Sequence, residues 1–182
     1  MVAMDEDSRR VVHSQNGDHG AFEALIKEHQ RMIHSLCYRM SGSLADAEDL
    51  AQETFIHAYQ RLDGFRAEAR FSSWLYRIAV NQCLNWQKQR QRLDRLHREW
   101  SQQDREPSRD GEAQANQIQA ALLKLPAKQR AAVILTTYDG LTHAEAAAAL
   151  GCSETTVSWR IFAARRKLKR LLQDQSKREA SQ

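Results

Sequence analysis

Residues that break regular structure are scarce in this chain of 182 residues, which has only seven glycines and two prolines. Average proteins contain about 7% glycine and about 5% proline, and turn-rich β-sandwiches depend on both. Their scarcity favours an all-α fold over an all-β one. Cysteine is also rare: Cys37, Cys83 and Cys152 are an odd number at wide spacing, which fits neither a disulfide framework nor a zinc site.

Long hydrophobic runs are missing as well. The longest, residues 131–135 and 146–150, have five residues each, whereas a membrane-spanning helix needs about 20. The acidic N-terminus lacks the apolar core of a secretory signal. We therefore expect a soluble, cytoplasmic protein without membrane insertion. The sequence has no glycine-rich phosphate loop, nucleophile elbow or paired-histidine motif, so no metal, no cofactor and no enzymatic activity are expected.

Charge is distributed unevenly along the chain, although the formal net charge is only +4. An acidic block at residues 46–63 carries a net charge of −4, and two basic segments, 76–98 and 153–172, carry +5 each. Solvated helix faces are one explanation of such runs. Two basic segments and one acidic block also indicate two contacts with anions and one with a basic partner.

Apolar residues recur at helical spacing on both sides of a polar segment. That segment, residues 97–114, has only Trp100 and Ala113 as apolar members and is interpreted as a linker. The chain is thus predicted to be all-α, with two small helical domains joined by a flexible linker. The expected parts are an N-terminal extension (1–20), a first domain (21–96), the linker (97–114), a second domain (115–173) and a tail (174–182).

The last two predicted helices have the spacing of a helix-turn-helix. Ala147 precedes Gly151 by four residues and Val157 follows it by six, which suits close helix approach, a left-handed turn and an apolar anchor. The second helix leaves polar, aromatic and basic side chains outside, as a helix that reads a DNA groove requires. Packing against a neighbouring helix is the alternative for its two aromatic residues. The candidate DNA-binding residues are Ser158, Trp159, Arg160, Phe162, Arg165 and Arg166.

A second candidate nucleic-acid surface lies on the helix expected over residues 74–95. Polar and basic residues recur there every three or four positions without an acid. Amides can hold an unstacked base while cations contact phosphates, and neighbouring aromatic rings can stack on single-stranded bases. Trp74 and Phe71 are expected in the core, whereas Phe65, beside Gly64, is expected to be exposed. The candidate residues are Phe65, Arg66, Arg77, Asn81, Asn85 and Lys88.

Several motifs in a fixed order resemble bacterial RNA polymerase sigma factors of the extracytoplasmic-function type, group IV of the sigma-70 family. They are DAEDLAQETF at residues 46–55, FSSWLYRIAVN at 71–81, the helix that follows Leu125-Pro126, and the terminal helix-turn-helix. The resemblance covers about residues 20–95 and 115–172. It implies sigma region 2 at 21–96 and sigma region 4 at 115–173.

The resemblance also implies partners. Core RNA polymerase would be bound through the β′ clamp helices and the β flap. The loop at 64–71 and the stripe on 74–95 would contact the −10 element of promoter DNA, and the terminal helix would enter the major groove of the −35 element. An anti-sigma factor and a role in stress response are further expectations. The residues expected to bind the clamp helices are Asp46, Glu48, Asp49, Gln52 and Glu53.

The function implied is an alternative sigma factor that binds core polymerase, recognises −35 and −10 elements and promotes strand opening without a covalent step. Two alternatives remain open at this stage. One is a helix-turn-helix transcriptional regulator that works without polymerase, and the other is a helical enzyme that processes RNA or DNA. A sigma factor would co-elute with core polymerase, whereas a polymerase-independent regulator would not. A requirement for a metal or a nucleotide would indicate the enzyme.

Overall fold

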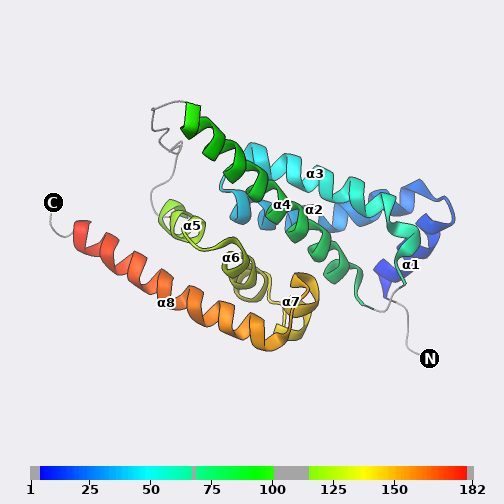
Figure 1. The fold of residues 1–182 in the computed structure, drawn as a ribbon. Coiled ribbons are helices and arrows are strands. Elements are labelled where there is room, and N and C mark those ends of the chain that lie inside the picture. The colour runs from blue at the N-terminus through cyan, green and yellow to red at the C-terminus, as the bar shows by residue number, and fades with distance from the viewer. Residues whose placement is uncertain (1–4, 67–68, 101–114, 180–182) are drawn as a thin grey trace.

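The computed structural model describes residues 5–66, 69–100 and 115–179, and all regular elements in these ranges are helical (Figure 1). This confirms the all-α prediction. The α-helices are α1 (Glu6–Gln15), α2 (His19–Ser41), α3 (Leu44–Gln60), α4 (Phe71–Trp100), α5 (Ala115–Leu123), α6 (Ala127–Val133), α7 (His143–Leu150) and α8 (Glu154–Glu179), with a 3-10 turn η1 (Leu62–Gly64) and a π-helical turn η2 (Ile134–Tyr138).

Helices α2, α3 and α4 pack together as the first domain. Their inward faces carry large apolar side chains that are fully buried, such as Leu25, Ile33 and Leu75. Gly42 ends α2 in the left-handed conformation, with φ of 80°. A Cβ at this position would collide with the Leu123 side chain of α5, so glycine allows both the turn and the close approach.

Helices α5 to α8 form the second domain, and its last two α-helices confirm the predicted helix-turn-helix. Thr142 and Glu145 form a capping box at the start of α7. Gly151 ends α7 with φ of 59°, in the left-handed conformation that favours glycine. The side chain of Ser153 then accepts a hydrogen bond from the amide of Thr156 in the first turn of α8.

The two domains pack directly against one another, which the prediction of two modules on a linker did not anticipate. Helix α7 lies against α4, while α5 and α6 contact α2. Figure 1 shows α5, α6 and α7 between α8 and the first domain. The side-chain amide of Gln119 in α5 donates hydrogen bonds to the carbonyls of Tyr38 (3.1 Å) and Arg39 (3.3 Å). Polar contacts therefore reinforce the apolar interface.

Two helix boundaries differ from the sequence-based expectations. Helix α4 starts at Phe71 and extends to Trp100, so residues 97–100, assigned to the linker, are helical. Good helix formers and no breaker precede Trp100, which lets the helix continue. The remaining linker residues, 101–114, lie outside the described part. The N-terminal extension contains α1, which packs on α2 with Val11 buried between them.

Candidate nucleic-acid and polymerase interfaces

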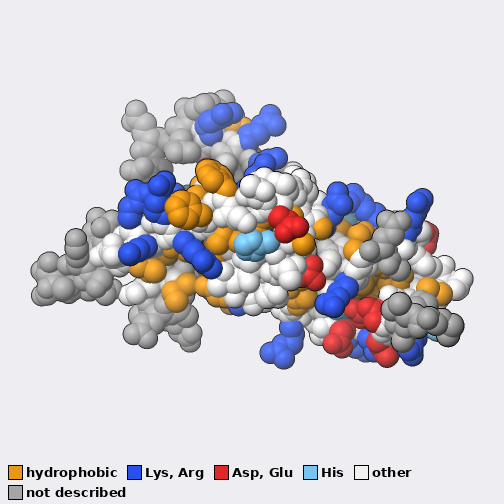
Figure 2. Space-filling view, turned by 90° about the horizontal axis from the view of Figure 1, so that it is seen from below, with side chains coloured by type: hydrophobic (Ala, Val, Ile, Leu, Met, Phe, Trp, Pro, Cys, Tyr) orange, Lys and Arg blue, Asp and Glu red, His pale blue; other side chains and the backbone are white. Residues whose placement is uncertain are grey.

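The exposed face of α8 carries aromatic and basic residues that were predicted from the sequence to bind DNA. Trp159 and Phe162 are 63% and 64% exposed, which contradicts the alternative that they pack against a neighbouring helix. In Figure 2, Lys and Arg side chains gather beside hydrophobic ones over α8. Ser158, Arg165 and Arg166 are also exposed, so the structure brings the nominated residues together on one helix.

Arg160 is the exception among the nominated α8 residues. It is only half-buried rather than exposed, and its guanidinium donates to the Sγ of Cys152 at 3.3 Å. Cys152 lies in the turn between α7 and α8, so this contact links the turn to the second helix. Ser158 in turn hydrogen-bonds His143 of α7, with 3.0 Å between Oγ and Nδ1. Both contacts fix how α8 sits on α7.

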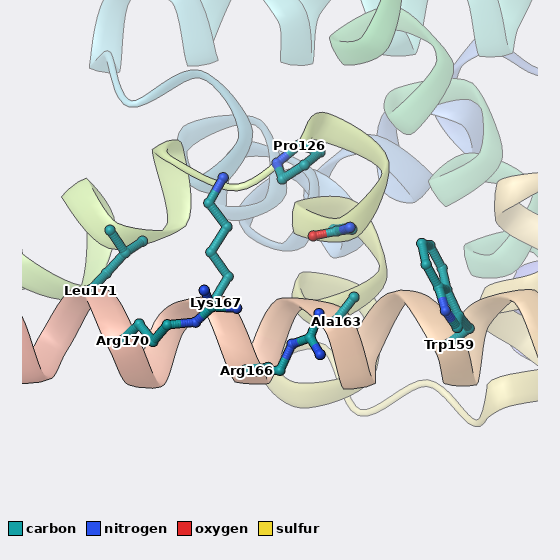
Figure 3. Close-up of a pocket in the computed structure, with 8 residues that line it drawn as sticks. Pro126, Trp159, Ala163, Arg166, Lys167, Arg170 and Leu171 are labelled. Carbon is teal, nitrogen blue, oxygen red and sulfur yellow. The ribbon is translucent and has the colours of Figure 1, made fainter.

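A groove of about 480 Å³ runs along α8 beside the start of α6. Trp159 and Lys167 point from α8 toward the α6 side of this groove, where Pro126 lies (Figure 3). Its other lining residues extend the basic surface beyond the nominated set. Sequence reasoning missed Gln129, Lys167 and Arg170, although the spacing of Arg166 and Arg170 by one helical turn was a usable signal.

The polar stripe on α4 is present as predicted. Arg77, Asn81, Asn85 and Lys88 are all exposed, and their spacing of three or four residues places them along one side of the helix. The second domain packs on α4 elsewhere and leaves these four side chains accessible. The stripe therefore offers amide and cationic groups in a continuous row, an arrangement suited to phosphates and unstacked bases.

The expected exposure of Phe65 is wrong. The side chain is 8% exposed and packs edge-on against Phe71, with ring centroids 5.8 Å apart, and against Trp74 at 5.1 Å. The 3-10 turn η1 directs the chain back toward the core, where burial of an aromatic ring is favourable. Arg66, the next residue, remains exposed. Phe71 is buried, as the sequence predicted.

The acidic residues of α3 form an exposed surface with one member already paired. Glu48, Asp49, Gln52 and Glu53 are exposed. Asp46 is less accessible, because its carboxylate accepts a hydrogen bond from Arg90 of α4 at 3.0 Å. Four of the five nominated residues are therefore available to a basic partner.

A surface groove of about 780 Å³ runs along the line where α2 and α3 pack together, and it includes part of this acidic surface. Glu48 and Gln52 line it from α3, whereas the α2 side was missed by sequence reasoning. No motif marks those α2 residues, since they alternate with core positions on the same helix. They are Ile26, Gln30, Arg31, His34, Ser35 and Tyr38.

The described residues contain no cluster of three or more metal-ligating side chains and no helix long and apolar enough to cross a membrane. Cys37 and Cys83 are buried with 3.9 Å between their sulfur atoms. The hydrogen bond between the two thiols, which favours the protonated form of Cys37, and burial both raise the pKa of the Cys37 thiol, so it stays protonated and unreactive at neutral pH.

Comparison with known proteins decides among the functional alternatives. Residues 25–93 match the family model for sigma-70 region 2, and residues 115–168 match that for sigma-70 region 4. The extracytoplasmic-function (ECF) RNA polymerase sigma factor SigM of Mycobacterium tuberculosis is 39% identical over 159 residues, which cover 86% of this chain and 79% of SigM. The chain belongs to the ECF sigma factors of the sigma-70 family. It is an alternative sigma factor, which recognises promoters and initiates transcription.

Another ECF sigma factor and two solved structures agree over most of the chain. SigW of Bacillus subtilis is 34% identical over 180 residues, covering 91% of this sigma factor and 96% of SigW. The solved structure of CnrH in complex with the cytosolic domain of CnrY superposes with a TM-score of 0.71 at 28% identity, covering 93% and 99% of the two chains. The sigma factor RpoE from Bartonella quintana, in complex with the anti-sigma factor NepR, gives 0.70 at 27% identity, covering 84% and 96%. The polymerase-independent regulator is not favoured.

Proposed function

We propose that the acidic surface of α3, with the adjoining α2–α3 groove, is the docking site for the β′ clamp helices of core RNA polymerase. The four exposed residues from Glu48 to Glu53 present carboxylate and amide groups on one helix. The neighbouring groove offers apolar area from Ile26 and Tyr38. A basic partner helix would gain charge complementarity at the acids and burial in the groove.

The α4 stripe and Arg66 are assigned to the −10 element. Asn81 and Asn85 supply amides for bases, and Arg77 and Lys88 lie one turn to either side of them, where cations meet phosphates. The loop that carries Arg66 would hold a base extruded from the non-template strand, and this capture favours strand opening. Phe65 has no direct DNA contact in this assignment, because its ring is in the core.

The exposed face of α8 is assigned to the major groove of the −35 element. Ser158 and Trp159 lie near the start of the helix, where side chains of helix-turn-helix proteins reach base edges. Arg165 and Arg166 follow two turns later and reach bases or phosphates. Arg160, held by Cys152, acts by supporting the turn. The β flap is the second polymerase contact, at this domain.

The sigma factor acts by binding alone, with no bond made or broken in its own chain. Since the similar sigma factor RpoE was solved with the anti-sigma factor NepR, this chain is proposed to have an anti-sigma factor of its own. Release from that inhibitor in the cytoplasm, under stress, would free it to bind core polymerase.

The observation that carries the proposal is the presence of two exposed basic surfaces, on α4 and on α8, on a chain whose third charged surface is acidic. The experiment is gel filtration of the chain with core polymerase, followed by footprinting of the complex on promoter DNA. Co-elution and protection of two sites, separated by a spacer, are expected. Separate elution from core polymerase would overturn the proposal.

A further inference from the structure

The last residue of α1, Gln15, contacts the start of the loop at residues 64–71, which is proposed to bind the −10 element and is called the −10 loop below. The side-chain Nε2 of Gln15 donates hydrogen bonds to the carbonyl oxygens of Leu62 at 2.8 Å and Phe65 at 3.1 Å. These carbonyls lie at the two ends of η1, directly before Arg66. Because Gln15 is half-buried and approaches the main chain, the contact does not depend on which side chains the loop carries.

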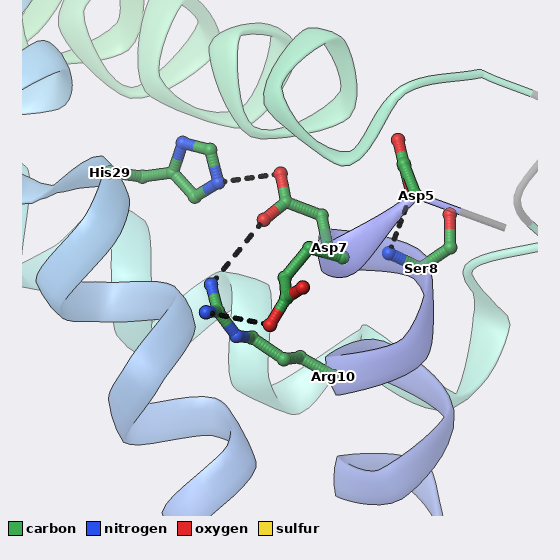
Figure 4. Close-up of polar contacts among 6 residues, drawn as sticks. Asp5, Asp7, Ser8, Arg10 and His29 are labelled. Carbon is green, nitrogen blue, oxygen red and sulfur yellow. Dashed lines mark hydrogen bonds and ion pairs between the residues drawn. The ribbon is translucent and has the colours of Figure 1, made fainter.

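A second connection between α1 and the loop runs through an aromatic cluster. Asp7 of α1 pairs with His29 of α2, with 2.8 Å between Oδ2 and Nε2, and Figure 4 shows this carboxylate between His29 and Arg10. The His29 ring lies 5.5 Å from that of Phe71, which in turn contacts Phe65. A series of contacts thereby connects α1 with the side chain of Phe65 as well as with its carbonyl.

A charge interaction also reaches the far end of the loop. Asp5, which caps the helix, accepts hydrogen bonds from Ser8, and these, together with the nearby charge of Arg70, lower the pKa of its carboxyl. Arg70 is the last residue before α4. Helix α1 thus contacts the chain at the entrance of the loop through Gln15, whereas its cap, Asp5, has only a charge interaction with Arg70 at the exit.

We propose that α1 is a positioning element for −10 recognition and that Gln15 is its principal residue. By fixing the backbone from Leu62 to Phe65, Gln15 presents Arg66 on the surface in one orientation before DNA arrives. Ordering a loop in advance lowers the entropy lost on binding. Gln15 itself touches no DNA. The inference rests on the proposed −10 role of the loop.

The test compares Gln15→Ala with the wild type in complex with core polymerase. The probes are the single-stranded non-template −10 DNA and the −35 duplex of a promoter mapped by run-off transcription. Affinity for the single strand should fall about tenfold, because two hydrogen bonds to the loop are lost. Affinities for the −35 duplex and for core polymerase should change less than about twofold, since both surfaces lie elsewhere. Gln15→Glu, which places a carboxylate against two carbonyls, should lose at least as much.

Asn16→Ala is the matched control, because Asn16 adjoins Gln15 but its side-chain amide donates to the carbonyl of Val12 in α1 and not to the loop. It should bind the single strand like the wild type. If Gln15→Ala lowers the thermal midpoint but keeps full single-strand affinity, Gln15 is merely structural and the inference is overturned. Failure of the wild type to bind the single strand would instead overturn the −10 role of the loop, and this inference with it.

Discussion

Arg130 of α6 donates a hydrogen bond from its guanidinium to the carbonyl of Met40 at the end of α2, which joins the second domain to the first. The same side chain donates to the carbonyls of Leu122, Leu123 and Leu125 at the end of α5. A cation at two helix C-termini is favoured by the helix dipoles. Burial lowers the pKa of Arg130 to about 10, so it stays charged at neutral pH.

Arg130→Ala should destabilise the chain strongly. The substitution leaves several buried carbonyls without a donor and removes packing between the domains, which costs about 2–4 kcal/mol in the free energy of unfolding. Urea unfolding followed by circular dichroism measures it. Lys128→Ala, on the exposed side of the same helix, is the control and should change stability by less than about 0.5 kcal/mol. An unchanged urea midpoint for Arg130→Ala would show that the domain contact contributes little.

Asp139→Asn should stabilise the chain at neutral pH. Burial raises the pKa of Asp139 to about 6, only partly opposed by Arg39, and its Oδ2 has no hydrogen-bond partner among the residues that the structure describes. The Asp139 carboxyl of the unfolded chain ionises at lower pH than that of the folded chain. As pH rises from about 4 to 6, ionisation therefore favours the unfolded chain and lowers the free energy of unfolding. Above pH 6 this loss of stability stays constant. The variant should gain about 1–3 kcal/mol over the wild type at pH 7 and nothing at pH 4.

The measurement for Asp139 is urea unfolding of both proteins at several pH values, taken as a difference so that other carboxyls cancel. Asp63→Asn, at an exposed position in η1, is the control and should change stability by less than about 0.5 kcal/mol. An equal gain at pH 4 and pH 7 would mean that the effect does not come from ionisation of Asp139.

Asp49→Arg should abolish binding to core polymerase while the fold stays intact. The residue is exposed on the acidic surface of α3, so reversal of its charge places like charges against a basic partner and weakens binding about 100-fold or more. Glu28→Arg changes charge equally at an exposed position on α2 outside the groove and should bind normally. Wild-type transcription by Asp49→Arg would contradict the assignment of α3.

Arg165→Ala should weaken binding to the −35 duplex by about 1–3 kcal/mol if its guanidinium pairs with a guanine. Competition with a scrambled duplex distinguishes a contact with a base from a contact with a phosphate. A loss confined to the promoter sequence identifies a base contact. An equal loss on scrambled DNA identifies a phosphate contact, with a smaller slope of affinity against salt concentration.

Much of the architecture follows from local sequence patterns. The period of three to four residues predicted the stripe from Arg77 to Lys88, and the position of Gly151 predicted the turn before α8, because both depend on neighbours within one or two turns. The exposure of Phe65 could not be read locally. Whether an aromatic ring beside a glycine faces solvent or the core depends on where the following helix packs. Here Phe71, the first residue of that helix, packs against the Phe65 ring and buries it.

The contacts that link distant segments were also out of reach. Gln15 bonds to carbonyls 47 and 50 residues away, and any polar residue at a helix end would look the same in the sequence. From the sequence alone, Arg130 would be predicted to be a surface cation, because its contact with α2 is formed only when α2 packs against α6. Such pairs depend on tertiary packing. The spacing of hydrophobic residues predicts which face of each helix is buried, but not which residues of two packed helices lie opposite one another.

The central claim is that the chain directs core RNA polymerase to promoters through its two basic surfaces. Run-off transcription with core polymerase on genomic fragments tests it most directly. The claim predicts discrete transcripts that depend on the chain and disappear with Asp49→Arg. Absence of any chain-dependent transcript from a polymerase that is active with another sigma factor would contradict it.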